Sequence, residues 1–412
     1  MIRSEKQFSD RIIIFSPDLD FQIINRQMLV TKKVSLPFKK IKAMSFTELG
    51  VSKEITKGLK ELGIFSPTKI QTAAIPVLSR DNIDFIGQAQ TGTGKTAAFG
   101  LPILSKIDPK KEFIQALILA PTRELGQQIA KQLFKFTKYT EPVYAEAVYG
   151  GEKIDIQMTR LKRPTHIVVA TPGRLIDLLN RKALDISKIT TLVLDEADEM
   201  LSMGFKDELN VILKHTEGDR NIWLFSATMP SELNEIIANY VSKDALRVNI
   251  DKDEAVNTGI EHQFVTGDDN NKLDTLALFL KSQGKNRGII FTRTKSAAKL
   301  LVKQLAAKNY EVGLLEGDMH QKDRDKVMRA FKNKTLRLLV ATDVAARGID
   351  VDNLAFVVHY QLPDQIEYYT HRSGRTARAG KTGISLVLVN QKELKRIWEL
   401  EKELKIKFLK IK

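Results

Sequence analysis

The stretch TLVLDEADEML, residues 191–201, joins an apolar run of strand length to a cluster of carboxylates. The acids are Asp195, Glu196, Asp198 and Glu199, and they follow a run suited to a buried strand. Unpaired charge is costly to bury, so these acids either face solvent or meet a cationic partner. A metal ion carried by a phosphate ligand would be one such partner.

Short aliphatic runs that end in polar or Gly-rich residues recur along the chain, each followed by a stretch of helical period. They include ALILAPTREL, HIVVATPGRL and NIWLFSAT in the first half, and RGIIFTRT, YEVGLLEGD, LRLLVATD, FVVHYQLP and GISLVLVN in the second. Continuous apolar runs predict strands buried on both faces, as in parallel α/β sheets. We therefore expect a basic extension over 1–43, a first α/β domain over 44–250, a polar linker over 251–258 and a second α/β domain over 259–412.

The bulk composition indicates a globular protein with an anionic partner. The chain has 412 residues, of which 43% are hydrophobic and 28% charged, and a formal net charge of +15. Such a basic surplus favours nucleic acid as the partner. The lack of cysteine excludes disulfides, thiolate metal sites and cysteine nucleophiles. No apolar run approaches the about 18 residues that span a bilayer, and no secretory signal opens the sequence, so we expect a cytoplasmic protein without membrane partners.

Residues 1–43 differ from the rest of the chain. They hold nine Lys or Arg against four Asp or Glu, without a sustained helix or strand period. Two explanations stay open: a flexible basic arm, or an upstream extension with Met44 as the natural start. The intact mass of the native protein distinguishes them, because a mass that begins at Met1 excludes the second.

The stretch FIGQAQTGTGKTAAF is the strongest local motif, and it predicts a phosphate site. Gly92 and Gly94 leave backbone N–H groups free to wrap an oxyanion, and the helix start that follows adds partial positive charge. In such loops the lysine, here Lys95, reaches the β- and γ-phosphates, and the hydroxyl of the next residue, Thr96, ligates Mg²⁺. The alternative is a Gly-rich strand-to-helix turn without a ligand.

A phosphate site about a hundred residues upstream favours a catalytic role for the acidic cluster. Asp195 becomes the second Mg²⁺ ligand, partly through water, and Glu196 orients or deprotonates the attacking water. Asp198 keeps an alternative role, because its carboxylate could hold a neighbouring loop by hydrogen bonding.

The second half carries YYTHRSGRTARAG instead of a phosphate loop. Arg372, Arg375 and Arg378 recur every three residues, which predicts one face of a helical turn. A guanidinium that reaches the γ-phosphate from here would be an arginine finger in cis, and a basic surface face is the alternative. One nucleotide site and one arginine cluster on separate domains predict ATP at the domain interface, with domain closure coupled to hydrolysis.

The order of these motifs resembles the DEAD-box family of ATP-dependent RNA helicases, over about nine-tenths of the chain. The motifs are Phe46 with GIFSPTKIQ, AQTGTGKT, PTREL, Gly150-Gly151, TPGR, DEAD, SAT, IIFTRT, QKDR, ATDVAARGID and HRSGRTAR. The resemblance implies an α/β fold of two tandem RecA-like domains, each a mainly parallel sheet flanked by helices, with a Q motif over about 44–72. Ala89, where the general phosphate-loop pattern has Gly, is the usual residue of the family.

The resemblance also implies the residues of the ATP site. Adenine recognition falls to Phe46 and Gln71, and Lys69 also belongs to the nucleotide-binding residues. The phosphate loop comprises Ala89, Gln90, Thr91, Gly92, Thr93, Gly94, Lys95 and Thr96. Mg²⁺ is held by Thr96 and Asp195. Catalysis further uses Glu196 and, from the second domain, His371, Arg375 and Arg378, with Asp350 on the ribose. Ser226 and Thr228 couple hydrolysis to strand separation, and His371 and Arg372 bridge toward the acidic and Ser-Ala-Thr loops.

The implied RNA site lies across both domains, on the other side of the strand-end edge. Its residues are Pro121, Thr122, Arg123, Gly151, Thr171, Arg174, Arg293, Thr294, Gln321, Arg324 and Thr342. Hydroxyls, arginines and bare glycine amides position phosphates and carry little sequence information. Taken singly, each has a structural alternative, such as a plain helix-entry turn at Thr171.

The function implied is that of an RNA-dependent ATPase that opens short duplexes locally or remodels RNA–protein complexes. We expect a monomer, with protein partners or an activator left open. One rival is an ATP-gated RNA clamp that uses the same residues, and another is a DNA-directed motor, which should lack the Phe46 and Gln71 motif.

Two residues depart from many relatives, Ser373 in place of Ile and Ala377 in place of Gly. Both positions are expected to be non-contacting, and both changes are expected to be tolerated.

Overall fold

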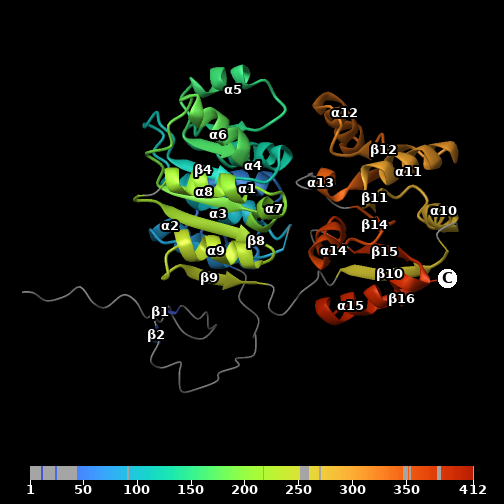
Figure 1. The fold of residues 1–412 in the computed structure, drawn as a ribbon. Helices are drawn as coiled ribbons and strands as arrows, with labels where there is room; N and C mark the ends of the chain where they lie inside the picture. Colours follow the sequence, from blue (N-terminus) through green and yellow to red (C-terminus); the bar gives the residue numbers. More distant parts are fainter. Residues whose placement is uncertain are drawn as a thin grey trace, which may run out of the picture.

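The structure of the protein is a computed structural model that describes residues 44–90, 92–216, 218–250, 259–268, 271–346, 351, 354–377 and 382–411, together with 11–12 and 24–25. Apart from the antiparallel pair β1 (Arg11–Ile12) and β2 (Ile24–Asn25), the described elements form two bodies, each built on its own sheet (Figure 1). The predicted linker and nearly all of the predicted N-terminal extension lie outside the described residues.

The first body is a parallel sheet of seven strands in the order β5-β6-β4-β7-β8-β3-β9. Its strands are β3 (Phe85–Gln88), β4 (Ala116–Leu119), β5 (Ala145–Val148), β6 (Ile167–Ala170), β7 (Thr191–Asp195), β8 (Asn221–Ser226) and β9 (Leu246–Asn249). Its helices are α1 (Lys53–Glu61), α2 (Lys69–Arg80), α3 (Lys95–Lys106), α4 (Arg123–Phe136), α5 (Ile154–Leu161), α6 (Pro172–Asn180), α7 (Ala197–Ser202), α8 (Lys206–His215) and α9 (Ser231–Tyr240).

The second body repeats this architecture in the order β12-β13-β11-β14-β15-β10-β16, again with parallel pairings. Its strands are β10 (Ile260–Thr266), β11 (Gly288–Thr292), β12 (Val312–Leu315), β13 (Leu338–Thr342), β14 (Phe356–His359), β15 (Gly383–Val389) and β16 (Phe408–Lys410). Its helices are α10 (Lys272–Ser282), α11 (Lys295–Ala307), α12 (Gln321–Lys332), α13 (Asp343–Ala346), α14 (Ile366–Ser373) and α15 (Leu394–Leu404), with a 3₁₀ turn, η3 (Gln391–Glu393).

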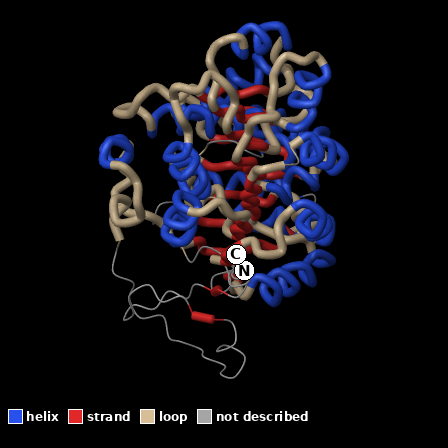
Figure 2. Tube along the Cα trace, turned by 90° about the vertical axis from the view of Figure 1, so that its left-hand side faces the viewer, coloured by secondary structure: helices blue, strands red, loops and turns tan. Residues whose placement is uncertain are grey.

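Continuous apolar runs form these strands because both faces of each sheet are covered. Successive residues of β4, Leu117 and Ile118, are both buried but belong to different hydrophobic clusters, one on each side of the sheet. Figure 2 shows the consequence, with the strands as a central layer and helices on either side. The predicted fold class, two tandem α/β domains with parallel sheets, is confirmed.

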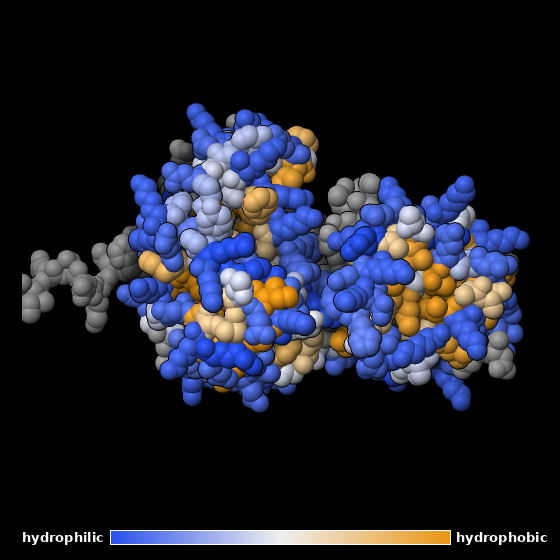
Figure 3. All heavy atoms as spheres, turned by 90° about the horizontal axis from the view of Figure 1, so that it is seen from above, coloured by the Kyte–Doolittle hydropathy of each residue, from blue (hydrophilic) through white to orange (hydrophobic). Residues whose placement is uncertain are grey.

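Polar residues end the central strands, and this edge positions the site. Asp195 and Ser226 are the last residues of β7 and β8, and Thr292 and Thr342 end β11 and β13. Ligands of open α/β sheets bind outside the carboxyl ends of the strands. The seam between the two bodies, viewed from above, is mostly hydrophilic (Figure 3).

Candidate functional site

The loop between β3 and α3 is shaped around two glycines with left-handed backbones. Gly92 and Gly94 have φ values of 85° and 91°. A Cβ on Gly94 would lie 2.3 Å from the side-chain nitrogen of Gln71, so glycine is required there for space as well as for φ. Lys95 is 6% exposed, and its Nζ donates to the carbonyl of Ala89 at 3.1 Å. The Thr93 hydroxyl donates to the carbonyl of Gln90 at 2.7 Å, and Thr96 follows in the first turn of α3.

Gln71 joins this loop to helix α2. Its Nε2 donates to the Gly94 carbonyl at 2.9 Å, and its Oε1 accepts from the backbone N–H of Thr68 at 3.0 Å. Lys69 is exposed at the start of α2. Phe46 is 1% exposed and packs in the hydrophobic core, so in this structure its ring has no free face for a base. Thr91 lies outside the described residues.

Two carboxylates of the acidic cluster lie beside this loop. Asp195 is 2% exposed, and burial raises its pKa to about 7, with Lys95 opposing the shift. The Asp195 carboxylate accepts from the backbone N–H of Glu196 at 3.1 Å. Glu196 has a φ of 51°, an unfavourable conformation for a residue with a Cβ, and such strain clusters at functional sites.

Asp198 holds the loop after β8. Its Oδ2 accepts from both the backbone N–H and the hydroxyl of Thr228, each at 2.8 Å. The backbone N–H of Asp198 donates to the Ser226 hydroxyl at 3.2 Å, and that hydroxyl donates to the Thr228 carbonyl at 2.7 Å. Burial acts to raise the pKa of Asp198, but His371, Lys95 and these hydrogen bonds outweigh it and lower the pKa. Of the two roles left open for Asp198, the structure therefore shows the loop-holding contact.

The second body completes the cavity above these groups. Residues from both bodies line it, among them Lys95, Glu196 and Glu199 from the first and His371, Arg375 and Tyr368 from the second. His371 Nδ1 forms an ion pair with the Glu199 carboxylate. Burial acts to lower the pKa of His371, but the contact with Glu199 and the charges of Asp198 and Glu196 outweigh it and raise the pKa.

The arginines of the second body are arranged differently from the prediction. Helix α14 ends at Ser373, so Arg375 follows the helix, and the prediction that Arg372 and Arg375 share one helix face is wrong. Arg372 binds Asp343 of its own body through Nε at 2.5 Å and Nη2 at 2.6 Å, and it does not bridge to the acidic or Ser-Ala-Thr loops in this structure. Arg378 and Asp350 lie outside the described residues.

The predicted RNA residues of the first body gather around the Gly-Gly loop after β5. Thr122 caps α4 by accepting from the backbone N–H of Leu125, and buried Pro121 precedes it. Gly151 has a φ of 91°, and a Cβ there would lie 2.4 Å from the Arg123 guanidinium. Both terminal nitrogens of Arg174 donate to the Glu152 carbonyl at 3.1 Å, and Thr171 is the N-cap of the same helix, α6.

The second body contributes a cavity on the same side. Arg293, Thr294 and Thr342 line it, and Thr294 caps α11 by accepting from the backbone N–H of Ala297 at 3.1 Å. Arg293 forms an ion pair with Asp364. Gln321 instead binds Asp325, one turn along α12, at 2.7 Å.

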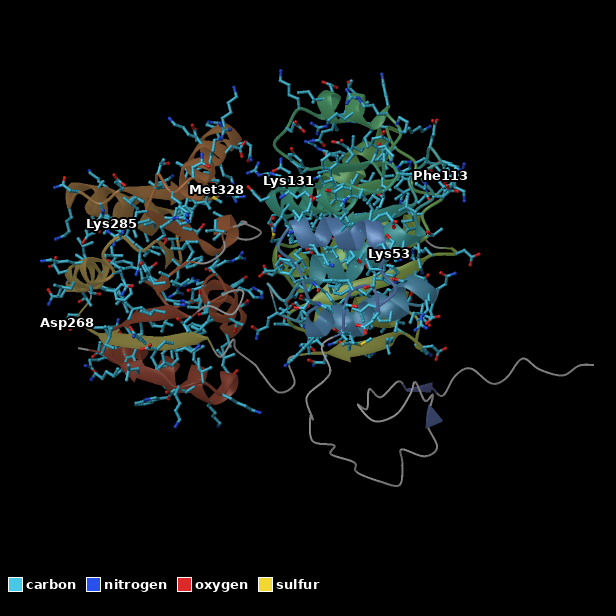
Figure 4. All side chains as sticks on the ribbon, turned by 180° about the vertical axis from the view of Figure 1, so that it is seen from behind. Lys53, Phe113, Lys131, Asp268, Lys285 and Met328 are labelled. Atoms are coloured by element: carbon cyan, nitrogen blue, oxygen red, sulfur yellow. The ribbon has the colours of Figure 1, made fainter. Side chains whose placement is uncertain are left out.

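Arg324 crosses between the bodies. Its Nε donates to Glu124 of α4, and its Nη2 donates to the Ala345 carbonyl at 2.6 Å. Figure 4 shows Lys131 of α4 and Met328 of α12 on the facing sides of the two bodies. Glu124 was missed from the sequence, because its function depends on a partner 200 positions away.

Two features are absent from the residues that the structure describes. Within the part of the chain that the structure describes, no helix is long and apolar enough to cross a membrane. Across the same residues, no group of three or more His, Cys, Asp or Glu side chains is placed to hold a metal ion.

Comparisons with known proteins agree with this geometry. The family model for DEAD/DEAH box helicases matches residues 68–236, and the model for the helicase conserved C-terminal domain matches residues 271–380. The DEAD-box ATP-dependent RNA helicase CshA of Geobacillus kaustophilus (strain HTA426) is 40% identical over 368 residues, which cover 89% of this chain and 78% of that protein.

Solved structures give the same relationship. S. cerevisiae Dbp5 bound to RNA and ADP BeF3 is 31% identical, with a TM-score of 0.82 over 90% of this chain and 96% of that one. A DEAD box protein from the hyperthermophile Methanococcus jannaschii is 38% identical, with a TM-score of 0.53 over 90% of this chain and 99% of that one. Because both family models match in order, one on each body, and a relative of this identity spans most of both chains, the chain belongs to the DEAD/DEAH box helicase family.

Proposed function

We propose that the protein is an RNA-dependent ATPase that opens short RNA duplexes locally or displaces proteins from RNA. The observation that carries this proposal is the cavity between the two bodies, to which one body contributes Lys95 and Glu196 and the other His371 and Arg375. A nucleotide held there would contact both bodies at once. Binding energy and hydrolysis can then bias how the bodies close on each other.

The residues around the phosphate loop fit ATP with Mg²⁺. The left-handed glycines turn backbone N–H groups toward an oxyanion, and Lys95 lies within the loop as its counter-charge. Mg²⁺ would be held by the Thr96 hydroxyl and by Asp195, and when bound it would neutralise charge on the phosphates. Burial raises the pKa of Asp195 to about 7, and a cation bound beside it would lower that pKa again, because an opposite charge favours the charged form of the carboxylate.

Glu196 is the group that would act on the attacking water. Its strained backbone turns it out of the strand at the start of α7, and it lines the cavity opposite Arg375. In this arrangement Glu196 accepts the proton of the water, and the guanidinium of Arg375 stabilises charge that develops on the γ-phosphate. Arg378 would add to this stabilisation, and Asp350 would hold the ribose.

Asp198 and Thr228 are suited to couple the two activities. The double hydrogen bond ties the acidic helix to the loop after β8, and His371 of the second body contacts Glu199 of the same helix. A change at the phosphates can therefore move the loop and the second body together. Ser226 strengthens this connection through the Thr228 carbonyl.

RNA would bind across both bodies through its phosphates. Arg123, Gly151 and Arg174 form one side, and Arg293, Thr294 and Thr342 form the other. Closure joins the two sides, since Arg324 of α12 pairs with Glu124 beside Arg123. A strand held on both sides would be bent by its backbone and 2′-OH contacts and would release its complement.

The similarity to solved structures supports a closed arrangement of the bodies. The TM-score is 0.82 with Dbp5 bound to RNA and ADP BeF3, and 0.53 with the Methanococcus jannaschii protein, although the latter has the higher identity. The bodies of this chain are therefore arranged more like those of the protein bound to RNA and nucleotide.

ATP hydrolysis by the purified protein tests the proposal. We expect strong stimulation by RNA and little by duplex DNA, and no stimulated hydrolysis by the Glu196→Gln variant. Equal stimulation by DNA would indicate a DNA-directed motor. Tight ATP-dependent RNA binding with slow turnover and no strand separation would indicate an RNA clamp.

A further inference from the structure

Helix α14 presents two adjacent tyrosine hydroxyls to different parts of the molecule. Tyr369 is buried in the second body, where its hydroxyl bonds to His262 Nδ1 at 2.5 Å and to the Ser385 hydroxyl at 3.3 Å. Tyr368 is half-buried, and its hydroxyl bonds to the Ser202 hydroxyl of the first body at 2.7 Å. Tyr369 therefore fixes α14 to its own sheet, and Tyr368 connects α14 to the first body.

The position of Tyr368 is set by the second body. Besides Tyr369, the neighbouring Arg372 binds Asp343 with two nitrogens, and Ser373 bonds to the Ser385 hydroxyl at 2.9 Å. These contacts hold α14 against β10, β15 and α13. Any rotation of the second body therefore moves the Tyr368 hydroxyl with it.

Ser202 belongs to the catalytic side of the first body. It is the last residue of α7, the short helix whose N-cap is Glu196. Asp198, within this helix, binds Thr228 of the loop after β8. A contact at Ser202 therefore acts on the C-terminal end of α7. Glu196, the residue proposed to act on water, lies at the N-terminal end of the same helix.

Tyr368 also borders both binding regions. It lines the cavity that contains Lys95 and Glu196, and it lines the cavity that contains Arg293 and Thr342. A side chain that borders both cavities and bonds across the seam can respond to either ligand.

We propose that Tyr368 is a positioning residue for ATP hydrolysis: its bond to Ser202 fixes α7 against α14 when the bodies close. This inference rests on the proposed function. The hydroxyl contacts no reacting atom. It favours the closed arrangement and holds the C-terminal end of α7, so that Glu196 at the N-terminal end keeps its direction into the cavity.

A double-mutant cycle tests this contact. Tyr368→Phe removes only the hydroxyl, and Ser202→Ala removes its partner. We expect each change to lower the RNA-stimulated kcat by about 2- to 10-fold, the range that follows from the usual net contribution of one hydrogen bond. The double variant should be no slower than the slower single variant, because both changes remove the same interaction.

Closure is measured separately from chemistry. The chain has no cysteine, so Lys53→Cys and Lys285→Cys, both exposed and on different bodies, allow a donor and an acceptor dye to be attached (Figure 4). With RNA and a non-hydrolysable ATP analogue, Tyr368→Phe and Ser202→Ala should each reduce the closed fraction, again without additivity. The matched control is Tyr310→Phe, which removes a hydroxyl that binds the Ala277 carbonyl within the second body.

The outcomes separate this inference from the proposed function. If the effects of the two changes on kcat multiplied in the double variant, the role of Tyr368 would be overturned. It would also be overturned if neither change affected kcat or closure. If wild-type hydrolysis is not stimulated by RNA, the proposed function fails, and the dye measurement with the analogue still decides whether the contact forms. An equal loss with Tyr310→Phe would indicate a general effect on the second body and would also overturn the inference.

Discussion

Asp198 and Thr228 are joined by two hydrogen bonds to one carboxylate oxygen, from the backbone N–H and from the hydroxyl, both at 2.8 Å. The pair connects the acidic helix α7 to the loop after β8, two segments 30 positions apart in the chain. The pKa of Asp198 is lowered despite burial, so the carboxylate stays charged and accepts both bonds at neutral pH. Beside the group proposed for chemistry, the acidic cluster thus contains a group that connects two segments of the first body.

Thr228→Val should uncouple hydrolysis from strand separation. The change keeps the side-chain shape and the backbone bond but removes the hydroxyl donor, which leaves Asp198 with a weaker hold on the loop. We expect RNA-stimulated ATPase activity to fall less than threefold, and the rate of unwinding of a short duplex to fall by about tenfold or more, on the scale of a lost hydrogen bond to a charged group. Parallel loss of both rates would contradict a coupling role.

Much of this site could be predicted because its motifs are local. The phosphate loop, the acidic strand end and the Ser-Ala-Thr loop each consist of neighbouring residues, and parallel strands bring their carboxyl ends to one edge. Lys95, Asp195 and Glu196 accordingly lie together as expected, although no local pattern revealed how Glu196 would be turned at its positive φ.

Partners that are distant in the chain could not be predicted. The spacing of the arginines suggested a shared helix face, but α14 ends at Ser373, and Arg372 is engaged by Asp343. Ser373, a position expected to contact neither ATP nor RNA, is buried and bonds to the hydroxyl of Ser385, a partner that the motif did not reveal. Such contacts depend on which strands become neighbours, and that information is absent from a motif.

Gly94→Ala should weaken ATP binding through backbone strain and steric conflict. Gly94 has a φ of 91°, and a Cβ there would meet the Gln71 side chain at 2.3 Å and displace the contact that joins α2 to the loop. We expect the Kd for ATP to rise by at least tenfold, measured by fluorescence with a labelled nucleotide. Gly50→Ala is a matched control, because Gly50 has the same φ of 91° with nothing within 4 Å of its Cβ position. If both variants bound ATP equally weakly, backbone strain alone would explain the effect.

Ala377→Gly should stabilise the second body. Ala377 is 1% exposed and has a φ of 54°, a left-handed conformation that glycine adopts without strain. Relief of that strain should slightly exceed the entropy that glycine adds to the unfolded chain together with the lost burial of the methyl group, for a net gain of at most about 0.5 kcal/mol in the free energy of unfolding. Thermal unfolding of the full chain measures it. Ala306→Gly, at an exposed position of α11, should instead cost about 0.5–1 kcal/mol, and a loss of stability in both variants would contradict the strain at Ala377.

Closure of the two bodies should weaken as pH rises above about 6.5, the ordinary pKa of histidine. In the closed arrangement Glu199 pairs with His371, and Asp198 and Glu196 face it from the same segment, so the pKa of His371 is raised even though burial opposes the shift. A histidine whose pKa is raised on closure favours the closed state fully below its ordinary pKa. That contribution is lost as pH rises through the raised value.

The dye pair at residues 53 and 285, with RNA and a non-hydrolysable ATP analogue, measures this dependence directly. The closed fraction of the wild-type protein should fall as pH rises above about 6.5, across the window where His371 loses its proton. His371→Gln keeps a polar side chain but carries no charge at any pH, so its closed fraction should be low and nearly independent of pH. A wild-type profile that stays flat, or a variant profile that falls equally steeply, would mean that other groups control the dependence of closure on pH.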